Sequence, residues 1–315
     1  MNILVFGKDG QLGKAFQEQL QHSSFRVSNI IRFVGRNECD LSEVSQVHNI
    51  LNNFKPQLII NAAAYTAVDK AETESELAFA INATAPEVMA EYAAKFGATL
   101  LHFSTDYVFD GSKQGVYSEL DKTNPLSIYG KSKEAGERAI IKAFADSGNQ
   151  NGKYAILRTS WVYGDGSNFI RTILRIAKER SVLRVIHDQY GMPTSASWLA
   201  ELGIHLVFDD SQLRPFISGI YHAVPQGETN WHGLACLAVQ TALDAGQKLQ
   251  ASLATISPIP ALEYPLPAPR PMNSRLSTNK LQIEVESLGL VSKLPHWNTP
   301  WDEQVVAYVK HLSNN

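Results

Sequence analysis

A glycine-rich loop near the start of the chain limits the possible folds more than any other feature. The apolar run 2–6 predicts a short buried strand, and the spacing G-x-x-G-x-x-G follows it directly. Glycine lets the backbone turn tightly and lets a pyrophosphate approach, while the N–H groups of the following helix bind the phosphates. Three glycines can also simply mark a turn, but the strand–loop–helix context favours a dinucleotide site. The residues expected to contact the cofactor here are Gly7, Gly10, Gln11, Leu12 and Gly13.

Strand-like and helix-like segments alternate through the first half of the chain. This alternation predicts an α/β fold with a Rossmann-type, doubly wound parallel sheet and right-handed crossovers. In such a sheet the functional groups lie at the carboxyl ends of the strands. Further strands are predicted at 30–34, 58–61, 99–104 and 154–159, with helices at 12–20, 41–54, 77–96 and 129–145.

The pattern changes after Gly164 and predicts a smaller, mixed α/β substrate domain. A helix at 168–180 and a strand at 183–186 are followed by a strand at 219–224, which we expect to return to the large sheet, and by a helix at 302–312. The predicted dinucleotide-binding domain therefore spans 1–165 with a returning segment near 218–245. The substrate-binding domain comprises 166–217 and 246–315.

One segment, 257–271, contains six of the fourteen prolines. So many prolines exclude a helix or a central strand, because proline lacks the backbone donor that both require. We expect an extended loop that wraps a cleft, with a plain surface linker as the alternative.

Composition excludes several other classes of protein. The net charge of −3 and the pI near 6.3 give no basic footprint for nucleic acid. Two isolated cysteines, Cys39 and Cys236, argue against a disulfide scaffold and suit a reducing compartment. Only a few apolar residues precede Gly7, and no apolar run reaches 18 residues, so neither a signal peptide nor a membrane span is expected. We expect a soluble, cytoplasmic protein.

The end of the second predicted strand distinguishes NADPH from NADH. A carboxylate there bonds a ribose 2′-hydroxyl, whereas an arginine accommodates a 2′-phosphate. Arg36 favours NADPH because a guanidinium pairs well with phosphate, while Glu38 keeps NADH as an alternative. Asp40 and Leu41 suit the adenine edge, although Asp40 could instead cap the next helix.

Three alanines, Ala62, Ala63 and Ala64, follow Asn61 at the end of the next predicted strand. Their small side chains would let the backbone lie close to the ribose and nicotinamide of the cofactor. Tight helix packing is the alternative role, and both can hold at once.

Tyr129 and Lys133 are spaced i, i+4, which places both side chains on one face of a predicted helix. A free tyrosine has a pKa of about 10, and a nearby ammonium lowers it by stabilising the phenolate. Tyr129 could then donate a proton to a carbonyl oxygen as hydride arrives at its carbon. Thr105, at the end of a predicted strand, supplies a hydroxyl for the same carbonyl or forms a simple turn. Together with the glycine loop, these residues indicate a nicotinamide-dependent reductase.

With these motifs the chain resembles the extended short-chain dehydrogenase/reductase superfamily and, within it, the dTDP-4-dehydrorhamnose reductase family. The narrower resemblance is carried by NAAAYTAVDKAE, STDYVFDG, PLSIYGKSKEAGE, RTSWVYG and RPMNSRLSTNKL. It implies NAD(P)H-dependent reduction of the 4-keto group of dTDP-4-dehydro-L-rhamnose to dTDP-L-rhamnose, a step toward cell-surface polysaccharide. It also implies catalytic roles for Thr105, Tyr129 and Lys133, of which the last two also contact the cofactor.

The same resemblance implies that Trp161 faces the sugar with its flat apolar ring, with burial in the core as the alternative. Asp106 and Tyr107 are expected on the substrate side. Dehydratases of the superfamily resemble one another in an Asp-Glu pair after this threonine, and the second carboxylate is missing here. Arg270 and Arg275 flank the proline-rich segment and could bind the diphosphate or remain surface charges.

No metal is expected at the active site, because the nine histidines show no HxxxH or HxH spacing. Part of the reductase family forms a dimer bridged by magnesium through glutamates in the first helix and near the C-terminus. Lys14-Ala15-Phe16 and Trp297-Asn298-Thr299 stand at those places here, which puts a Mg²⁺-bridged dimer in doubt, although Glu18 remains available. A homodimer without metal stays open.

Two other functions remain compatible with these motifs. One is another epimerase or reductase of a nucleotide sugar. The other is a non-catalytic NADP-binding regulatory subunit, since the regulatory subunit of methionine adenosyltransferase resembles this reductase family. An intact set of Thr105, Tyr129 and Lys133 argues against the second.

Overall fold

The computed structural model describes residues 1–21, 29–148, 152–209 and 212–314. The larger of its two units is built on a six-stranded parallel sheet. The strand order is β12-β5-β4-β3-β1-β2, and every neighbouring pair is parallel. The order reverses between β1 and β3, so the sheet is doubly wound, as predicted. The strands are β1 (Asn2–Phe6), β2 (Ile30–Val34), β3 (Leu58–Asn61), β4 (Thr99–Thr105), β5 (Lys153–Thr159) and β12 (Gly219–His222).

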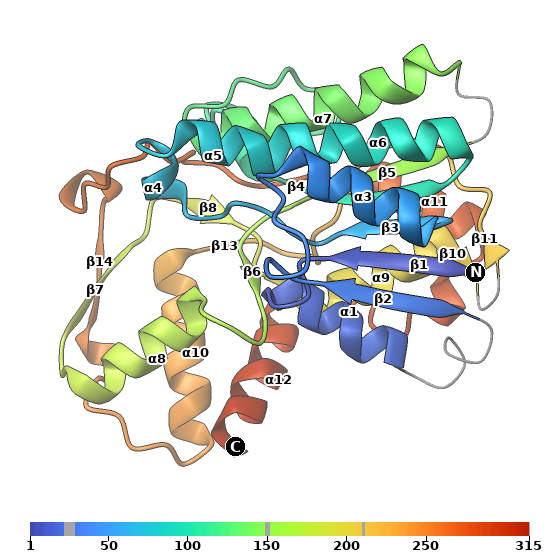
Figure 1. The fold of residues 1–315 in the computed structure, drawn as a ribbon. Helices are drawn as coiled ribbons and strands as arrows, with labels where there is room; N and C mark the ends of the chain where they lie inside the picture. The colour runs from blue at the N-terminus through green and yellow to red at the C-terminus, as the bar shows by residue number, and fades with distance from the viewer. Residues whose placement is uncertain (22–28, 149–151, 210–211, 315) are drawn as a thin grey trace.

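Helices cover both faces of this sheet (Figure 1), which explains why its strands read as nearly continuous apolar runs. Ile3 and Val5 belong to a core shared with α1 (Gln11–Gln21), α9 (Ala196–Val207) and α11 (Asn279–Ser287). Leu4 and Phe6 point to the opposite face, which α3 (Val44–Phe54), α6 (Ala85–Phe96) and α7 (Ile128–Asp146) cover. Odd and even positions of one strand thus enter different cores.

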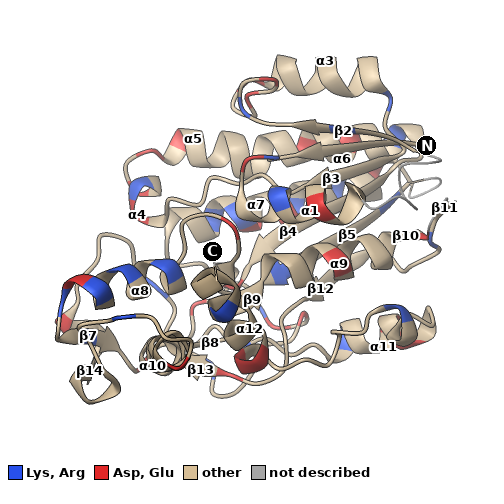
Figure 2. Cartoon of the chain, turned by 90° about the horizontal axis from the view of Figure 1, so that it is seen from below, with Lys and Arg blue, Asp and Glu red and all other residues tan. Residues whose placement is uncertain are grey.

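A second, smaller unit packs around a core of its own. Its helices are α8 (Phe169–Glu179), α10 (Trp231–Asp244) and α12 (Trp301–Asn314), and they group together away from the large sheet (Figure 2). A two-stranded parallel ribbon, β7 (Leu183–Ile186) and β14 (Ile256–Ile259), lies against α10.

The proline-rich segment is only partly the loop that its composition predicts, because its first residues form β14. Pro258 is tolerated there because β14 pairs with a single strand, so one of its edges needs no donor. Farther along, the segment reaches α4 (Val68–Ala71), since the Ala268 N–H donates to Asp69 Oδ1 at 3.1 Å.

The packing of three helices differs from the predicted domain boundaries. Helices α9 and α11 lie on the large sheet, although both fall in the predicted substrate domain. Conversely, α10 follows the returning strand β12 but packs in the smaller unit. We therefore propose a division in which α9 and α11 belong with the cofactor-binding sheet and α10 with the substrate side.

The predicted helix 77–96 is interrupted. A π-helical turn, Ala80–Thr84, separates α5 (Ser75–Phe79) from α6. Its Asn82 holds the loop after β3 by accepting from the Tyr65 N–H (2.8 Å) and donating to the Tyr65 carbonyl (3.0 Å). The remaining strands form short pairs: β6 (Val162–Tyr163) with β9 (Thr194–Ser195), β8 (Tyr190–Gly191) with β13 (Thr229–Asn230), and β10 (Phe208–Asp209) with β11 (Gln212–Leu213).

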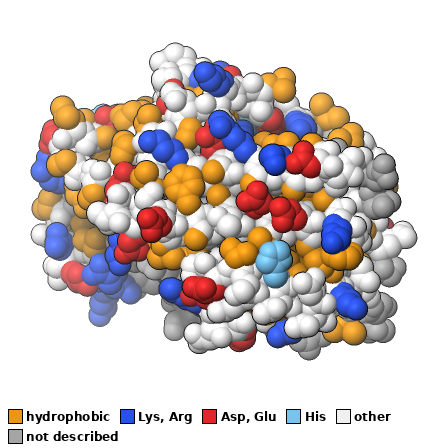
Figure 3. Space-filling view, turned by 45° about the horizontal axis from the view of Figure 1, so that its top comes forward, with side chains coloured by type: hydrophobic (Ala, Val, Ile, Leu, Met, Phe, Trp, Pro, Cys, Tyr) orange, Lys and Arg blue, Asp and Glu red, His pale blue; other side chains and the backbone are white. Residues whose placement is uncertain are grey.

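On the face shown in Figure 3, acidic and basic side chains are interspersed. Within the described residues, no helix is both long and apolar enough to span a bilayer.

Candidate active site

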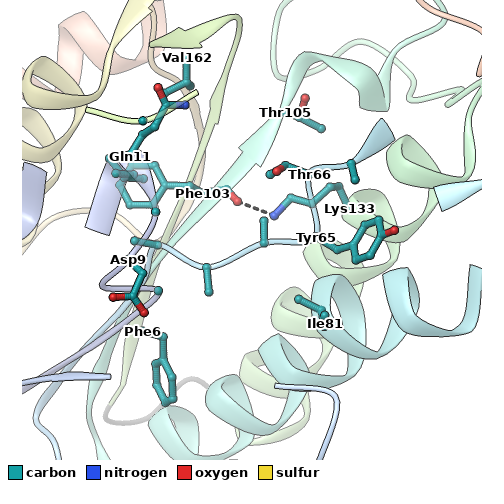
Figure 4. A pocket seen from close by; sticks show the side chains of 18 of the residues that line it. Phe6, Asp9, Gln11, Tyr65, Thr66, Ile81, Phe103, Thr105, Lys133 and Val162 are labelled. Atoms are coloured by element: carbon teal, nitrogen blue, oxygen red, sulfur yellow. Dashed lines mark hydrogen bonds between the residues drawn. The ribbon is translucent and has the colours of Figure 1, made fainter. Parts of the chain in front are cut away.

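A cleft of about 900 Å³ opens at the carboxyl ends of the sheet strands and extends to the smaller unit. It brings together the predicted residues that follow β1, β2, β3 and β4 with those of α7 and Trp161. Figure 4 shows Phe6 and Asp9 toward one end of this cleft and Thr105 and Lys133 toward the other. Of the residues considered for the site, four do not line it: Gly13, Glu38, Arg270 and Arg275.

The glycines of the loop let its backbone pack closely against neighbouring segments. Gly7 has φ +84°, and a Cβ there would lie 2.6 Å from the Ala63 nitrogen. A Cβ on Gly13 would overlap the Gly7 carbonyl oxygen, so Gly13 serves the close packing of α1 on the loop rather than the cleft surface. Because α1 begins at Gln11, its free N–H groups and positive end face the cleft, which fits a pyrophosphate.

Ion pairs organise the end of β2. Arg36, whose side chain is 74% exposed, pairs with Asp40 through Nε at 3.2 Å. Glu38 pairs with Lys8 and accepts the Gly35 N–H at 2.9 Å. Both arginine and carboxylate are therefore present, but Arg36 lines the cleft and Glu38 does not.

The loop after β3 forms the floor of the cleft with its backbone. Ala62, Ala63 and Ala64 all line the cleft. The Ala62 N–H donates to the Phe6 carbonyl at 3.1 Å, which joins this loop to the end of β1.

Thr105 ends β4 and caps the short 3₁₀ helix Asp106–Val108. Its hydroxyl donates to Asp106 Oδ1 at 2.9 Å and accepts from the Tyr107 N–H at 3.2 Å. Burial raises the pKa of Asp106 to about 6, against the opposing effect of hydrogen bonds from Ser274 and Thr105. The ring of Tyr107 meets that of Tyr129 edge to face, with centroids 5.4 Å apart.

Tyr129 and Lys133 lie on the first turns of α7, which the Ser127 hydroxyl caps by accepting the Gly130 N–H at 3.2 Å. Gly130 permits a close approach, because a Cβ there would overlap the Tyr107 carbonyl oxygen. The pKa of Tyr129 is not lowered as the sequence predicts: burial raises it to about 12, while a hydrogen bond with Thr105 acts in the opposite direction. Burial lowers the pKa of Lys133 to about 8, opposed by the charge of Glu137.

Trp161 lines the cleft but does not present a free ring face. Its ring stacks on Trp231, with centroids 3.5 Å apart and planes 11° apart. Gly191 covers the other face, since a Cβ there would come nearest to the ring-fusion atom Cε2, with Cζ2 at 2.6 Å and Cδ2 at 2.8 Å. An atom that lies nearest to a ring-fusion carbon must approach from above the ring plane. A sugar would therefore meet the edges of the two indoles.

Arg270 lies outside the cleft and is engaged by α4. Its guanidinium forms two bonds with the Asp69 carboxylate, at 2.8 and 3.1 Å, and another with the Ala268 carbonyl at 2.9 Å. Arg275 is likewise paired, with Glu228 at 2.9 Å. Neither residue lines the cleft, although the Arg270 guanidinium also interacts with Tyr107, which does.

Several residues near the site carried no signal in the sequence. No motif around Trp231 indicates that it stacks on Trp161. The hydrogen bonds between Asn82 and the loop after β3 depend on a π-helical turn that the sequence did not predict. His102 lies inside an apolar strand pattern and reaches Lys133. Within the described residues, no cluster of three or more His, Cys, Asp or Glu side chains could hold a metal ion.

The glycine loop on a doubly wound sheet, with Tyr129, Lys133 and Thr105 in the same cleft, defines a Rossmann-type short-chain dehydrogenase/reductase. A family model, the RmlD substrate binding domain, matches residues 1–312. The chain belongs to this family.

Curated relatives and solved structures agree with that assignment. The chain is 44% identical over 305 residues to a dTDP-4-dehydrorhamnose reductase of Salmonella typhimurium, and 43% identical over 301 residues to one of Escherichia coli, with 94% of each chain covered in both cases. Its fold is similar to a crystal structure of a Clostridium acetobutylicum dTDP-4-dehydrorhamnose reductase (TM-score 0.84, 32% identity, 99% of both chains). A Bacillus anthracis dTDP-4-dehydrorhamnose reductase in complex with NADP is also similar (TM-score 0.80, 31% identity, 98% of both chains).

Proposed function

We propose that this protein reduces the 4-keto group of dTDP-4-dehydro-L-rhamnose with NADPH, giving dTDP-L-rhamnose. The observation that carries the proposal is that Thr105, Tyr129 and Lys133 lie in the same cleft as the glycine loop. The relatives named dTDP-4-dehydrorhamnose reductase, at 44% and 43% identity over nearly the whole chain, support the choice of substrate.

NADPH supplies the hydride when it is bound, and the chain's own residues handle the proton. The Thr105 hydroxyl, which in this structure donates its only proton to Asp106 Oδ1, turns that proton to the carbonyl oxygen and orients it. Tyr129 donates its phenolic proton to the same oxygen. The resulting phenolate is unfavourable in a buried site, and the ammonium of Lys133, one helical turn away, stabilises it. Before substrate binds, the high pKa of the buried Tyr129 phenol keeps its proton on the oxygen, where it is available for the carbonyl.

The preference for NADPH rests on the ion pairs after β2. Glu38 is held by Lys8 and the Gly35 N–H. Arg36 is paired with Asp40 through Nε but is exposed on the cleft wall, where its guanidinium can also pair with a 2′-phosphate. The NADP found in the Bacillus anthracis relative supports the same choice. Asp40 and Leu41 would lie beside the adenine.

The sugar would lie between Thr105 and the paired indoles, with Asp106 and Tyr107 beside it. The edge of the Trp161 ring, rather than its face, would contact the deoxyhexose. Arg270 could hold the diphosphate only by exchanging Asp69 for it. A cytoplasmic location and a homodimer remain predictions of the sequence.

The first test is the loss of NADPH absorbance with dTDP-4-dehydro-L-rhamnose, comparing the wild type with Tyr129→Phe. We expect wild-type turnover and a decrease in kcat of roughly 10²–10⁴-fold in the variant, the range for a lost general acid, with NADPH binding retained. No wild-type turnover despite tight NADPH binding would overturn the assignment and point to another keto-sugar or to a regulatory role.

A further inference from the structure

A fully buried histidine contacts the lysine of the active site. His102 lies on β4 three residues before Thr105, and its Nε2 is 3.3 Å from Lys133 Nζ. On its other side, His102 Nδ1 lies 3.0 Å from Asn61 Nδ2, at the end of β3. Lys133 Nζ also donates to the Phe103 carbonyl at 2.6 Å, the contact drawn in Figure 4. The reaction described above uses neither His102 nor Asn61.

The neighbours of Asn61 determine which nitrogen of His102 carries the proton. Asn61 Oδ1 accepts the Ala63 N–H at 3.2 Å, so the amide group of Asn61 must face His102. That amide can only donate, and His102 Nδ1 must therefore accept. In a neutral imidazole the proton is then on Nε2, directed at Lys133 Nζ.

A hydrogen directed at Lys133 Nζ favours the amine over the ammonium. The amine has a lone pair that accepts from His102 Nε2–H and a proton that bonds the Phe103 carbonyl. The ammonium has three donors and no acceptor, so it would place two hydrogens against each other. Four groups thus form a directed chain of hydrogen bonds, from the Ala63 N–H through Asn61 and His102 to Lys133.

We propose that Asn61 and His102 are positioning residues that disfavour the ammonium form of Lys133 and thereby set the alkaline limit of reductase activity. This inference rests on the function proposed above, because that reaction needs a charged Lys133 beside Tyr129. As pH rises and Lys133 loses its proton, the phenolate of Tyr129 loses its support and kcat decreases.

The other ionisable groups around Lys133 do not reverse this effect. On α7 itself, Tyr129 lies one turn before Lys133 and Glu137 one turn after it. The Glu137 carboxylate is bound by Arg158 of β5 through two bonds of 2.6 and 2.8 Å, with both side chains 3% exposed. Asp106, after β4, acts on Tyr129. Burial, with the charge of Lys133 adding to it, lowers the pKa of His102 well below its usual value, so His102 stays neutral at neutral pH.

The decisive measurement is the titration of Lys133 by NMR of the full chain labelled at lysine ε-carbons, with the resonance assigned by its loss in Lys133→Met. In His102→Gln, a carboxamide oxygen can accept from the ammonium, so we expect the Lys133 pKa to rise by about one unit or more. Asn61→Asp keeps an acceptor for the Ala63 N–H and forces the His102 proton onto Nδ1, which leaves Nε2 as an acceptor. It should raise the Lys133 pKa as well, and it provides a second test should His102→Gln fail to fold.

His222→Gln is the matched control. His222 is another fully buried histidine of the same sheet, on β12, and its replacement should leave the Lys133 titration unchanged. The alkaline limb of the kcat profile should move with the Lys133 pKa in both test variants. An unchanged or lowered Lys133 pKa in them would overturn the proposal. The NMR titration needs no substrate, so an inactive wild type with the expected shift would instead overturn the proposed reaction alone.

Discussion

The indole of Trp231 stacks on the indole of Trp161, with ring centroids 3.5 Å and ring planes 11° apart. Trp161 follows β5 of the large sheet, whereas Trp231 begins α10 of the smaller unit, so the stack joins the two in the lining of the cleft. The backbone of Trp161 has φ +48°, a left-handed conformation that costs a non-glycine residue about 1–3 kcal/mol. The packing of its ring between Gly191 and Trp231 offsets this cost.

Gly191→Ala should displace the Trp161 ring, because the new Cβ would overlap it. We expect the KM for the nucleotide sugar to rise by roughly tenfold or more while the Kd for NADPH is retained, since about 1.4 kcal/mol of lost contact corresponds to a factor of ten. Steady-state kinetics and NADPH titration measure the two effects. Trp198→Phe is the control, because Trp198 stacks on Trp297 outside the cleft. Equal changes in both variants would argue against a sugar-facing role.

Arg36→Ala should weaken NADPH binding and leave NADH binding nearly unchanged. Loss of a charge-assisted hydrogen bond to the 2′-phosphate is worth about 1.5–3 kcal/mol, or roughly tenfold to hundredfold in KM. The matched control is Arg138→Ala, which removes an arginine of similar exposure from a comparable i, i+4 ion pair on α7. If both cofactors lose affinity equally in Arg36→Ala, the assignment of Arg36 to the 2′-phosphate is wrong.

Asp106→Asn should change how stability depends on pH. Burial raises the pKa of Asp106 to about 6 in the folded protein, above its ordinary value of 3.8. The folded state therefore binds more protons between about pH 4 and pH 6, and its stability falls as pH rises through that window. The variant has no carboxyl to titrate at this position. Its free energy of unfolding relative to the wild type should therefore rise by at most about 3 kcal/mol between pH 4 and pH 7. Thermal unfolding at both pH values measures it, and a parallel decrease in Tm at both would contradict the prediction.

Gly13→Ala should destabilise the fold and impair cofactor binding, because its Cβ would overlap the Gly7 carbonyl and push α1 away from β1. Overpacking of this kind costs typically about 1–3 kcal/mol. Gly10→Ala is the informative comparison, since the nearest atom to a Cβ there is the Gly7 oxygen at an ordinary 3.5 Å. We expect a lowered Tm in Gly13→Ala and an unchanged Tm in Gly10→Ala. A similar Tm in the two variants would contradict the packing role of Gly13.

Local sequence determined the elements and the order in which they alternate. The strands at 30–34, 58–61 and 183–186 begin and end where the sequence predicted them, and α7 includes Tyr129 and Lys133 on one face. These features depend on contacts between residues close in the chain: apolar periodicity, glycine at a tight turn, and side chains one helical turn apart. Each of these features can be recognised in the sequence without knowledge of the rest of the fold.

Tertiary structure decided which distant surface meets each of these elements. The sequence could not tell that Asp69 would engage Arg270, 201 residues away, or that Gly191 and Trp231 would cover both faces of Trp161. It likewise gave no reason to place α9 and α11 on the large sheet and α10 in the smaller unit. An apolar stripe requires burial but does not specify its partner, because several surfaces of similar size and hydrophobicity would satisfy it. The partner is selected only when the whole chain packs. The same packing decided that Asp69 occupies the guanidinium of Arg270 and that His102 contacts Lys133.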